Sequence, residues 1–215
     1  MSDRLAIAIL AAGGATRFGG GKLDADLAGK RLGCHVLDTV LSLNLGTPII
    51  ITSDIPPAFA REAALHGLAA LLPNRRSADG LGSSVALAAT HAIRTEASGL
   101  LVVLADMPLI SPGTLAHLAA ISGRASAVRH ADGQPGIPAC FPPDWFADLQ
   151  NLGGERGASA LLRERKDVQV LAVAPHELSD VDTPDQLAGV AAALIDQQDH
   201  SSSVGPKNGG NPAPE

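Results

Sequence analysis

Aromatic residues are scarce in this 215-residue sequence, which has no tyrosine, one tryptophan and four phenylalanines. Proteins that bind single-stranded nucleic acid commonly stack bases on aromatic side chains, and binding to a phosphate backbone requires clustered lysines and arginines. Here the formal net charge is −6 and the basic residues are scattered. We therefore predict a small-molecule ligand and no nucleic-acid partner.

Cysteines and long apolar runs are also few. Cys34 and Cys140 have neither Cys-x-x-Cys nor metal-ligand spacing, which predicts free thiols in a reducing compartment. The apolar run at 5–11 is too short to span a bilayer. Glycines and cations follow it where a leader peptide would carry its cleavage site. These observations predict a cytoplasmic protein with no membrane association.

Short apolar runs recur along the chain and have the length of buried strands. They lie at 5–11, 48–52, 69–72, 100–104 and 168–173. Segments with helical spacing lie between them, so strands and helices alternate. This alternation predicts an α/β fold of three layers, Rossmann-like, with a mostly parallel sheet and helices on both faces.

The length and the 46% hydrophobic composition suit one domain, which we place at 1–198. The glycines and prolines of 130–143 predict a loop with a short strand, inserted before the last β–α unit. Ser83 or Ser84 is predicted to cap a helix. The stretch 199–215 has almost no apolar residues and is predicted to be a disordered tail.

A glycine-rich segment at 10–22 directly follows the first predicted strand. Ligands of open α/β sheets bind beyond the carboxyl ends of strands, and glycines let backbone N–H groups approach an anion. Arg17 and Lys22 can neutralise phosphate charge. Lys22 is followed by Leu23, so the hydroxyl of a P-loop is absent. The segment predicts a phosphate-binding loop, with a purely structural turn as the alternative.

Two aspartates are candidate metal ligands. Asp106 follows the apolar run 100–104, so its carboxylate is expected at the carboxyl end of that strand, beside the first loop. Asp182 precedes Thr183 and Pro184. Mg²⁺ usually takes one or two protein carboxylates and completes its shell with water and phosphate oxygens. The alternative for Asp182 is that it only caps a helix.

The sequence resembles the MobA-like NTP transferases, and among them particularly the molybdenum cofactor cytidylyltransferases. The resemblance runs from Leu5 to about Ile195, in the family's order. Its motifs are Ala11-Ala12-Gly13, Arg17-Phe18-Gly19 with Lys22, Gly80-Leu81-Gly82-Ser83-Ser84, Leu104-Ala105-Asp106-Met107-Pro108, Gly153-Gly154-Glu155-Arg156-Gly157-Ala158 and Val181-Asp182-Thr183-Pro184.

The resemblance implies a fold of the nucleotide-diphospho-sugar transferase type and a Mg²⁺-dependent reaction. CMP from CTP, or GMP from GTP, would pass to a phosphorylated acceptor, molybdopterin carrying molybdenum, with release of pyrophosphate. Arg17, Lys22 and Asp106 would be catalytic, and Asp106 and Asp182 would bind the metal. The predicted nucleotide-binding residues are Ala11, Ala12, Gly13, Gly14, Arg17, Lys22, Gly80, Leu81, Gly82 and Ser83.

The acceptor side departs from the family pattern. The family typically has Gly-His-Pro where this chain has Gly136-Ile137-Pro138, and Glu155 stands where an aspartate is usual. The predicted acceptor-binding residues are Gly136, Pro138 and Gly157. Because Ile137 replaces the histidine, a sugar phosphate or another small phosphate remains an alternative acceptor.

The resemblance also implies a protein partner, a molybdenum hydroxylase of the xanthine dehydrogenase type that receives the finished cofactor. A non-catalytic carrier of that cofactor is the alternative from a different functional class. Arg17, Lys22, Asp106 and Asp182 are all retained. This combination favours catalysis, because a carrier has less use for a metal–triphosphate site.

Overall fold

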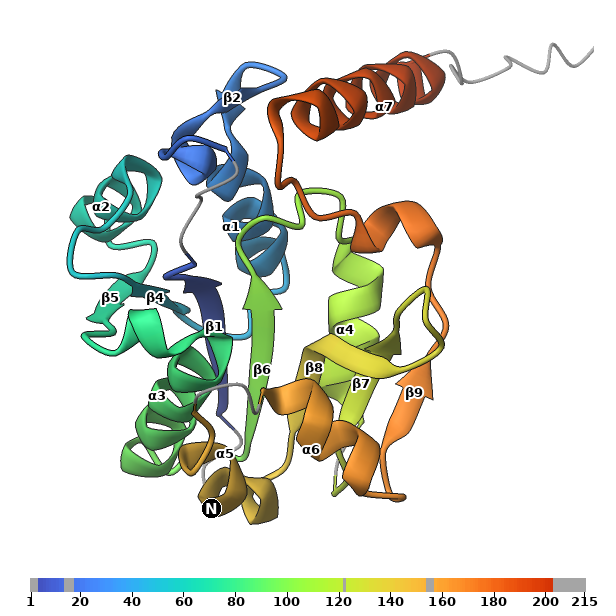
Figure 1. The fold of residues 1–215 in the computed structure, drawn as a ribbon. Coiled ribbons are helices and arrows are strands. Elements are labelled where there is room, and N and C mark those ends of the chain that lie inside the picture. The colour runs from blue at the N-terminus through green and yellow to red at the C-terminus, as the bar shows by residue number, and fades with distance from the viewer. Residues whose placement is uncertain (1–3, 14–17, 122, 154–156, 203–215) are drawn as a thin grey trace, which may run out of the picture.

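The computed structural model describes residues 4–13, 18–121, 123–153 and 157–202. A seven-stranded sheet with the order β5-β4-β1-β6-β8-β7-β9 forms the centre of this part of the chain (Figure 1). Its strands are β1 (Leu5–Ala11), β4 (Ile49–Thr52), β5 (Ala70–Pro73), β6 (Gly99–Leu104), β7 (Ser126–Arg129), β8 (Pro135–Phe141) and β9 (Gln169–Leu171). Of these seven strands, only β8 runs opposite to the others.

Helices cover both faces of the sheet, as the sequence predicts. One face carries α1 (Leu32–Ser42), α2 (Ala58–Leu65) and α4 (Pro112–Ala120), and the other carries α3 (Leu81–Arg94), α5 (Phe146–Gln150) and α6 (Ala158–Glu164). A further helix, α7 (Pro184–Ser202), follows the last strand. Short 3₁₀ turns add η1 (Lys22–Asp24), η2 (Ser77–Asp79), η3 (Pro143–Trp145) and η4 (Pro175–Leu178). No helix in the described ranges is long and apolar enough to cross a membrane.

Strand β1 shows why the molecule has three layers. Its alternate side chains enter two separate buried clusters, because successive residues of a strand point to opposite faces. Ile7 and Ile9 pack in the cluster that contains α1, α2 and α4. Ala8 and Leu10 pack in the cluster that contains α3, α5 and α6. An apolar strand with helices on both sides is the arrangement expected of a parallel sheet, so the predicted fold class is confirmed.

Strand β8 occupies the region that the sequence analysis assigned to a loop with a short strand. It is a full interior strand, although it contains Pro135 and Pro138. The pairing with β7 shifts between Ala127 and Val128, so Ile137 and Pro138 fall outside the regular register. A proline has no N–H to donate, and a bulge is where a strand tolerates it.

Helix α7 packs away from the main sheet, at the upper right of Figure 1. Leu27 and Leu32, from the small hairpin of β2 (Asp26–Leu27) and β3 (Lys30–Arg31) and the start of α1, form a third buried cluster with Val181 and Val190. The helix ends at Ser202 and therefore includes the first residues of the expected tail. Residues 203–215 lie outside the described residues, so the tail remains a prediction.

Candidate active site

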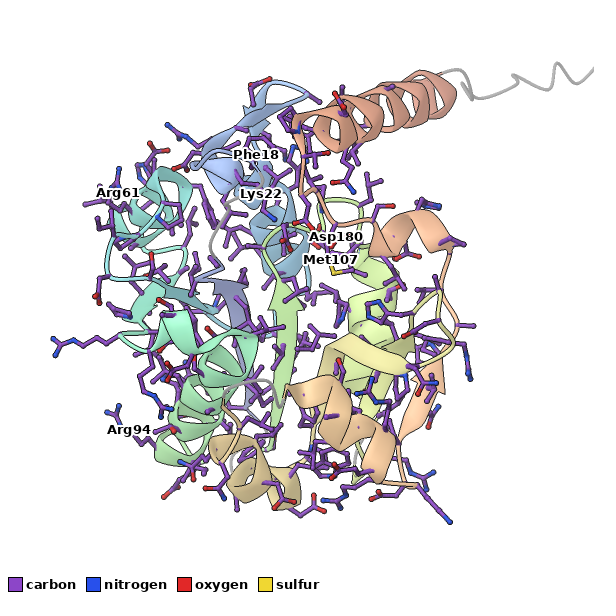
Figure 2. The ribbon with its side chains drawn as sticks, in the orientation of Figure 1. Phe18, Lys22, Arg61, Arg94, Met107 and Asp180 are labelled. Carbon is purple, nitrogen blue, oxygen red and sulfur yellow. The ribbon has the colours of Figure 1, made fainter. Side chains whose placement is uncertain are left out.

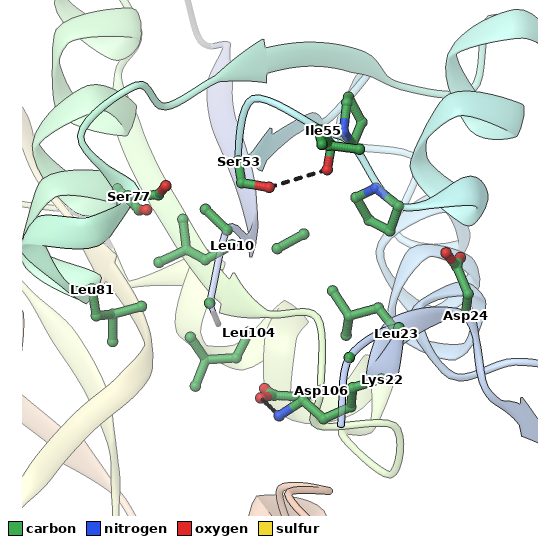
Figure 3. A pocket seen from close by; sticks show the side chains of 18 of the residues that line it. Leu10, Lys22, Leu23, Asp24, Ser53, Ile55, Ser77, Leu81, Leu104 and Asp106 are labelled. Carbon is green, nitrogen blue, oxygen red and sulfur yellow. Dashed lines mark hydrogen bonds and ion pairs between the residues drawn. The ribbon is translucent and has the colours of Figure 1, made fainter. Parts of the chain in front are cut away.

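A cavity of about 610 Å³ opens at the carboxyl ends of β1 and β6. Strands β4 and β5 follow β1 in the chain and lie on one side of β1 within the sheet. The next strand, β6, lies on the other side of β1. The crevice at such a reversal of strand order is where open α/β sheets bind ligands. Leu10 and Ala11 of β1, Leu104 of β6 and Asp106 line the cavity. Figure 3 shows it from close by, with Leu10, Leu81 and Leu104 on one side and Leu23, Lys22 and Asp106 on another.

Lys22 joins the two predicted metal ligands. Its Nζ donates to Asp106 Oδ2 at 2.7 Å and to Asp182 Oδ1 at 2.9 Å. Only 9% of Lys22 is exposed. The three residues come from the first loop, the end of β6 and the segment before α7. Figure 2 shows these segments gathered above the carboxyl ends of β1 and β6, with Lys22 near Met107 and Asp180.

Lys22 remains a cation in this environment. Burial by itself would lower the pKa of its ammonium, because desolvation disfavours the charged form. The negative charges of Asp106 and Asp182, together with the hydrogen bonds that they accept, outweigh that effect. The pKa of Lys22 is therefore raised above its ordinary value.

The backbone fixes the position of Asp106. Ala105, immediately before it, donates its N–H to the carbonyl oxygen of Leu10, which extends the pairing of β6 with β1. The carbonyl oxygen of Asp106 then accepts from the N–H of Val181 at 3.0 Å. This second bond ties the end of β6 to the segment that carries Asp182.

A helix cap fixes the position of Asp182. Gln186 Oε1 accepts from the backbone N–H of Asp182 at 2.8 Å and of Thr183 at 2.9 Å. In return, Thr183 Oγ1 accepts from the N–H of Gln186 at 3.3 Å, which completes a capping box at the start of α7. Thr183 is thus the residue that caps the helix. The carboxylate of Asp182 turns to Lys22, so capping is not its only role.

The first loop contributes backbone and glycines to the cavity wall. Ala11, Ala12 and Gly13 line the cavity, as do Gly20 and Gly21. Gly20 and Gly21 have φ values of 99° and 64°, a conformation that glycine adopts without strain. Gly14 and Arg17 were also predicted to bind the nucleotide, and both lie outside the described residues.

The start of α3 forms a second wall. Gly80, Leu81 and Ser84 line the cavity, whereas Gly82 and Ser83 do not. Helix α3 begins after Gly80, which has a φ of 89°, and no side chain caps it. The prediction that Ser83 or Ser84 caps this helix is therefore wrong: both serines are inside it and buried.

Asn74 holds the start of α3 in place, and the sequence analysis did not identify it. Its buried amide Nδ2 donates to Ser83 Oγ at 2.9 Å and to Ser84 Oγ at 3.0 Å. Its Oδ1 accepts from the N–H of Arg76 at 2.9 Å. A single asparagine thus connects the end of β5 to the cavity-lining end of α3. No local motif marks Asn74, because its partners lie nine and ten residues further along the chain.

Asp24 performs a similar task for α2 and was also missed. Its carboxylate accepts from the backbone N–H of Ala58 at 2.7 Å and of Phe59 at 2.8 Å. These are N–H groups of the first turn of α2, so Asp24 stabilises that helix end from outside the helix. The bonds fix the first loop against the loop before α2, where Ser53, Ile55 and Pro56 line the cavity.

The predicted acceptor-binding residues lie away from this cavity. Gly136 and Pro138 are in β8, Gly157 precedes α6, and none of the three lines the cavity beside Asp106. Ile137 is buried in the core, and its carbonyl oxygen contacts His130 Nε2 at 2.9 Å. Nothing in this arrangement tests the acceptor assignment, which stays a prediction. Glu155 and Arg156, of the same proposed region, lie outside the described residues.

The two aspartates suit a hard divalent ion. Two carboxylate oxygens that converge on one ammonium show that this position stabilises positive charge. Among the described residues no group of three or more His, Cys, Asp or Glu side chains could hold a metal. A pair of carboxylates is the protein share of a typical Mg²⁺ site, in which phosphate oxygens and water supply the rest.

Comparison with known proteins identifies the family. The MobA-like NTP transferase domain matches residues 7–170. The chain belongs to this family. The match includes the first loop, Lys22 and Asp106. It ends within β9, so Asp182 lies beyond the matched residues.

Related proteins extend the similarity over most of the chain. The purine catabolism protein PucB of Bacillus subtilis (strain 168) is 28% identical over 200 residues, which are 86% of this chain and 95% of PucB. Rv0371c of Mycobacterium tuberculosis, solved with manganese, is 21% identical with a TM-score of 0.64, over 89% of this chain and all of that one. A CMP:2-keto-3-deoxy-manno-octonic acid synthetase with CTP is 17% identical with a TM-score of 0.67, over 90% and 99%.

These comparisons confirm the predicted family and the predicted nucleotidyltransferase fold. This MobA-like protein is a nucleotidyltransferase by family. The two structural similarities are below 25% identity and bear on the fold alone.

Proposed function

We propose that this MobA-like protein transfers CMP from CTP to the phosphate of molybdopterin carrying molybdenum, with Mg²⁺ as its metal ion. One observation carries the proposal: Asp106 and Asp182, which are 76 residues apart in sequence, converge with Lys22 beside the glycine-rich first loop. A cation site next to a loop of backbone amides is what a metal-bound triphosphate requires.

In the proposed reaction, a phosphate oxygen of the acceptor attacks the α-phosphorus of the nucleotide. A new P–O bond forms, the bond from the α-phosphorus to the bridging oxygen breaks, and pyrophosphate leaves with the bonding electrons. The acceptor oxygen is already anionic, so no general base is needed. The protein then has two tasks, which are positioning and neutralisation of charge.

Several described residues of the cavity have a place in this scheme. The amides of Ala12 and Gly13 approach the phosphates, and the Lys22 ammonium neutralises them, together with Arg17 by resemblance. Asp106 and Asp182 hold Mg²⁺, which supplies positive charge to the phosphate oxygens when it is bound. The start of α3, at Gly80 and Leu81, takes the ribose and base.

The choice of CTP over GTP rests on Ala11-Ala12-Gly13 and Arg17-Phe18-Gly19, which resemble the cytidylyl branch of the family. The synthetase of the same fold, solved with CTP, supports this choice. The choice of Mg²⁺ rests on the paired carboxylates, and the manganese complex of Rv0371c supports a divalent ion.

The proposed acceptor and partner rest on the family resemblance. PucB is named for purine catabolism. Xanthine is a purine, so a hydroxylase of the xanthine dehydrogenase type is a reasonable recipient of the cofactor. Ile137, in place of the family histidine, keeps one alternative open, which is transfer to a sugar phosphate or another small phosphate.

A panel of nucleotides tests the proposal. Purified protein is given Mg²⁺, each of the four NTPs separately, and either molybdenum cofactor or a set of sugar phosphates. We expect pyrophosphate release with CTP and molybdenum cofactor. Pyrophosphate release with GTP instead of CTP would reassign the nucleotide base. Release only with a sugar phosphate would reassign the acceptor. Tight binding of the cofactor without consumption of any NTP would favour a carrier instead of an enzyme.

A further inference from the structure

The ammonium of Lys22 occupies the position between the two carboxylates that the proposed metal ion needs. Its Nζ lies 2.7 Å from Asp106 Oδ2 and 2.9 Å from Asp182 Oδ1. We propose that Lys22 excludes divalent metal from this pair in the nucleotide-free protein, and that it moves to the triphosphate when a metal–nucleotide complex binds. This inference rests on the proposed function, because it assumes that the cavity binds an NTP.

The exclusion follows from charge and space. A Mg²⁺ ion binds its oxygen ligands at about 2.0–2.1 Å, so it competes with an ammonium for the same lone pairs. Metal and ammonium carry the same sign of charge, and at contact distance in a partly buried site they repel each other. Asp106 and Asp182 can therefore bind Lys22 or a metal, and not both through these oxygens.

Leaving the pair empty is also unfavourable. Both carboxylates contact the same ammonium, so without a cation between them their negative charges would repel each other. Lys22 reduces that repulsion in the absence of nucleotide. When a metal binds to the carboxylates, the displaced ammonium needs a new anionic partner. The triphosphate on the first loop provides it. Metal and nucleotide should therefore bind with positive coupling, each increasing the affinity for the other.

The structure allows this movement without a change of fold. Lys22 is the first residue of η1, and its carbonyl oxygen accepts from the N–H of Ala25. Asp24, two residues later, is held by the N–H groups of α2. The backbone of this turn is thus anchored, whereas the lysine side chain has a flexible four-carbon stem. Lys22 also lines the large cavity, so the ammonium has space to turn towards a bound ligand.

Binding of Mn²⁺, followed by the electron paramagnetic resonance signal of the free ion, tests this inference without any turnover. Wild type is compared with Lys22→Met, which keeps an unbranched side chain of nearly the same length and removes the ammonium charge. Lys30→Met is the matched control, because Lys30 pairs with Asp38 on the surface. Without nucleotide, we expect Lys22→Met to bind Mn²⁺ about tenfold more tightly than wild type. Lys30→Met should bind it as wild type does.

Two further binding experiments test whether the metal binds to the carboxylates that Lys22 contacts. The double variant Lys22→Met with Asp182→Asn should lose the gain, because the metal then has one carboxylate fewer. A non-hydrolysable CTP analogue should strengthen Mn²⁺ binding to wild type, beyond what the nucleotide alone binds, and this coupling should shrink in Lys22→Met. Circular dichroism confirms that the variants are folded, and Lys22→Gln replaces Lys22→Met if the latter is not.

Equal Mn²⁺ affinity in folded Lys22→Met and wild type would overturn the inference, and so would an undiminished coupling to the nucleotide analogue. These failures differ from failure of the proposed function. If no NTP is consumed, the gain in Mn²⁺ affinity of Lys22→Met still reports that lysine competes with metal. If CMP transfer is observed but the gain is absent, only the exchange of cations is wrong.

Discussion

The backbone N–H of Val181 donates to the carbonyl oxygen of Asp106 at 3.0 Å. This bond connects the end of β6 to the segment before α7, which lies beyond the part of the chain that matches the family domain. The bond lies directly beside both candidate metal ligands, because Asp106 itself accepts it and Asp182 is the next residue after its donor, Val181. The distance between their carboxylates is therefore set by a backbone contact as well as by Lys22.

Gln186 should matter for activity although it does not line the cavity. Gln186→Ala removes the acceptor for the N–H groups of Asp182 and Thr183. We expect a loss of about 1 kcal/mol in the free energy of unfolding, typical of a lost helix cap. The Mg²⁺ concentration that gives half-maximal turnover should rise, because Asp182 is then held less firmly. Urea unfolding and a Mg²⁺ titration of pyrophosphate release measure both effects.

Gln150→Ala is the matched control for this variant. Gln150 also makes a side-chain hydrogen bond, to Thr90 Oγ1, on the exposed side of α5. It should leave the metal dependence unchanged. If Gln186→Ala has the same metal dependence as wild type, the capping box does not position Asp182.

Asp106 should contribute more to turnover than to nucleotide binding. Asp106→Asn keeps the size of the side chain and removes its charge, so the site holds metal less well. The metal's stabilisation grows as charge develops in the transition state. We expect turnover to fall about 100-fold or more, with a much smaller change in the dissociation constant of CTP. Asp38→Asn, at the surface pair with Lys30, is the control, and wild-type turnover in Asp106→Asn would contradict the assignment.

The central part of the sheet could be predicted from the sequence, because parallel strands covered on both faces are continuous apolar runs. The runs at 5–11 and 100–104 correspond to β1 and to most of β6. In β7 only Ala127 and Val128 are apolar, and β8 contains two prolines, so neither has the usual signal of a strand. Their antiparallel pairing depends on a register shift that no local pattern indicates.

The candidate site was predicted residue by residue, but its connections were not. The local sequence context and the family resemblance indicated Lys22, Asp106 and Asp182 separately. Contacts across 84 and 160 residues cannot be inferred from one sequence, so the bridging role of Lys22 appears only in the structure. The start of α7 carries one further signal in its sequence. Thr183-x-x-Gln186 is a capping-box pattern, and it indicates that Thr183 caps the helix and leaves the Asp182 carboxylate for another partner.

Glu177 should make stability depend on pH. Burial alone would raise the pKa of its carboxyl, but the hydrogen bonds donated by Ser111 and Thr114 outweigh burial and lower it below the ordinary 4.5. A lowered pKa in the folded state gives stability that is present above the unfolded pKa and is lost as the pH falls through the folded pKa. Because η4 leads into the segment of Asp182, this contact also anchors the site.

Replacement of Glu177 by glutamine tests this dependence. We expect Glu177→Gln to melt at a lower temperature than wild type above about pH 5, with the difference shrinking as the pH falls below the unfolded value, where the wild-type carboxyl is neutral too. Glu96→Gln, at an exposed surface position, is the control. A difference in melting temperature that is constant from pH 7 to pH 3 would show that the charge of Glu177 has no part in it.

Asn74 should affect nucleotide binding more than the rate of transfer. Asn74→Ala leaves the Ser84 hydroxyl without the amide that holds it and frees the start of α3. We expect a loss of about 2 kcal/mol in the free energy of unfolding, the cost of unpaired buried polar groups. The KM for CTP should rise severalfold with a smaller change in kcat, because Gly80 and Leu81 lie on the wall proposed for base and ribose.

Asn151→Ala, which removes an exposed bond to the carbonyl oxygen of Ala147, is the matched control. A fall in kcat with an unchanged KM would instead place the start of α3 against the reacting phosphates, and the base would have to be sought elsewhere in the cavity.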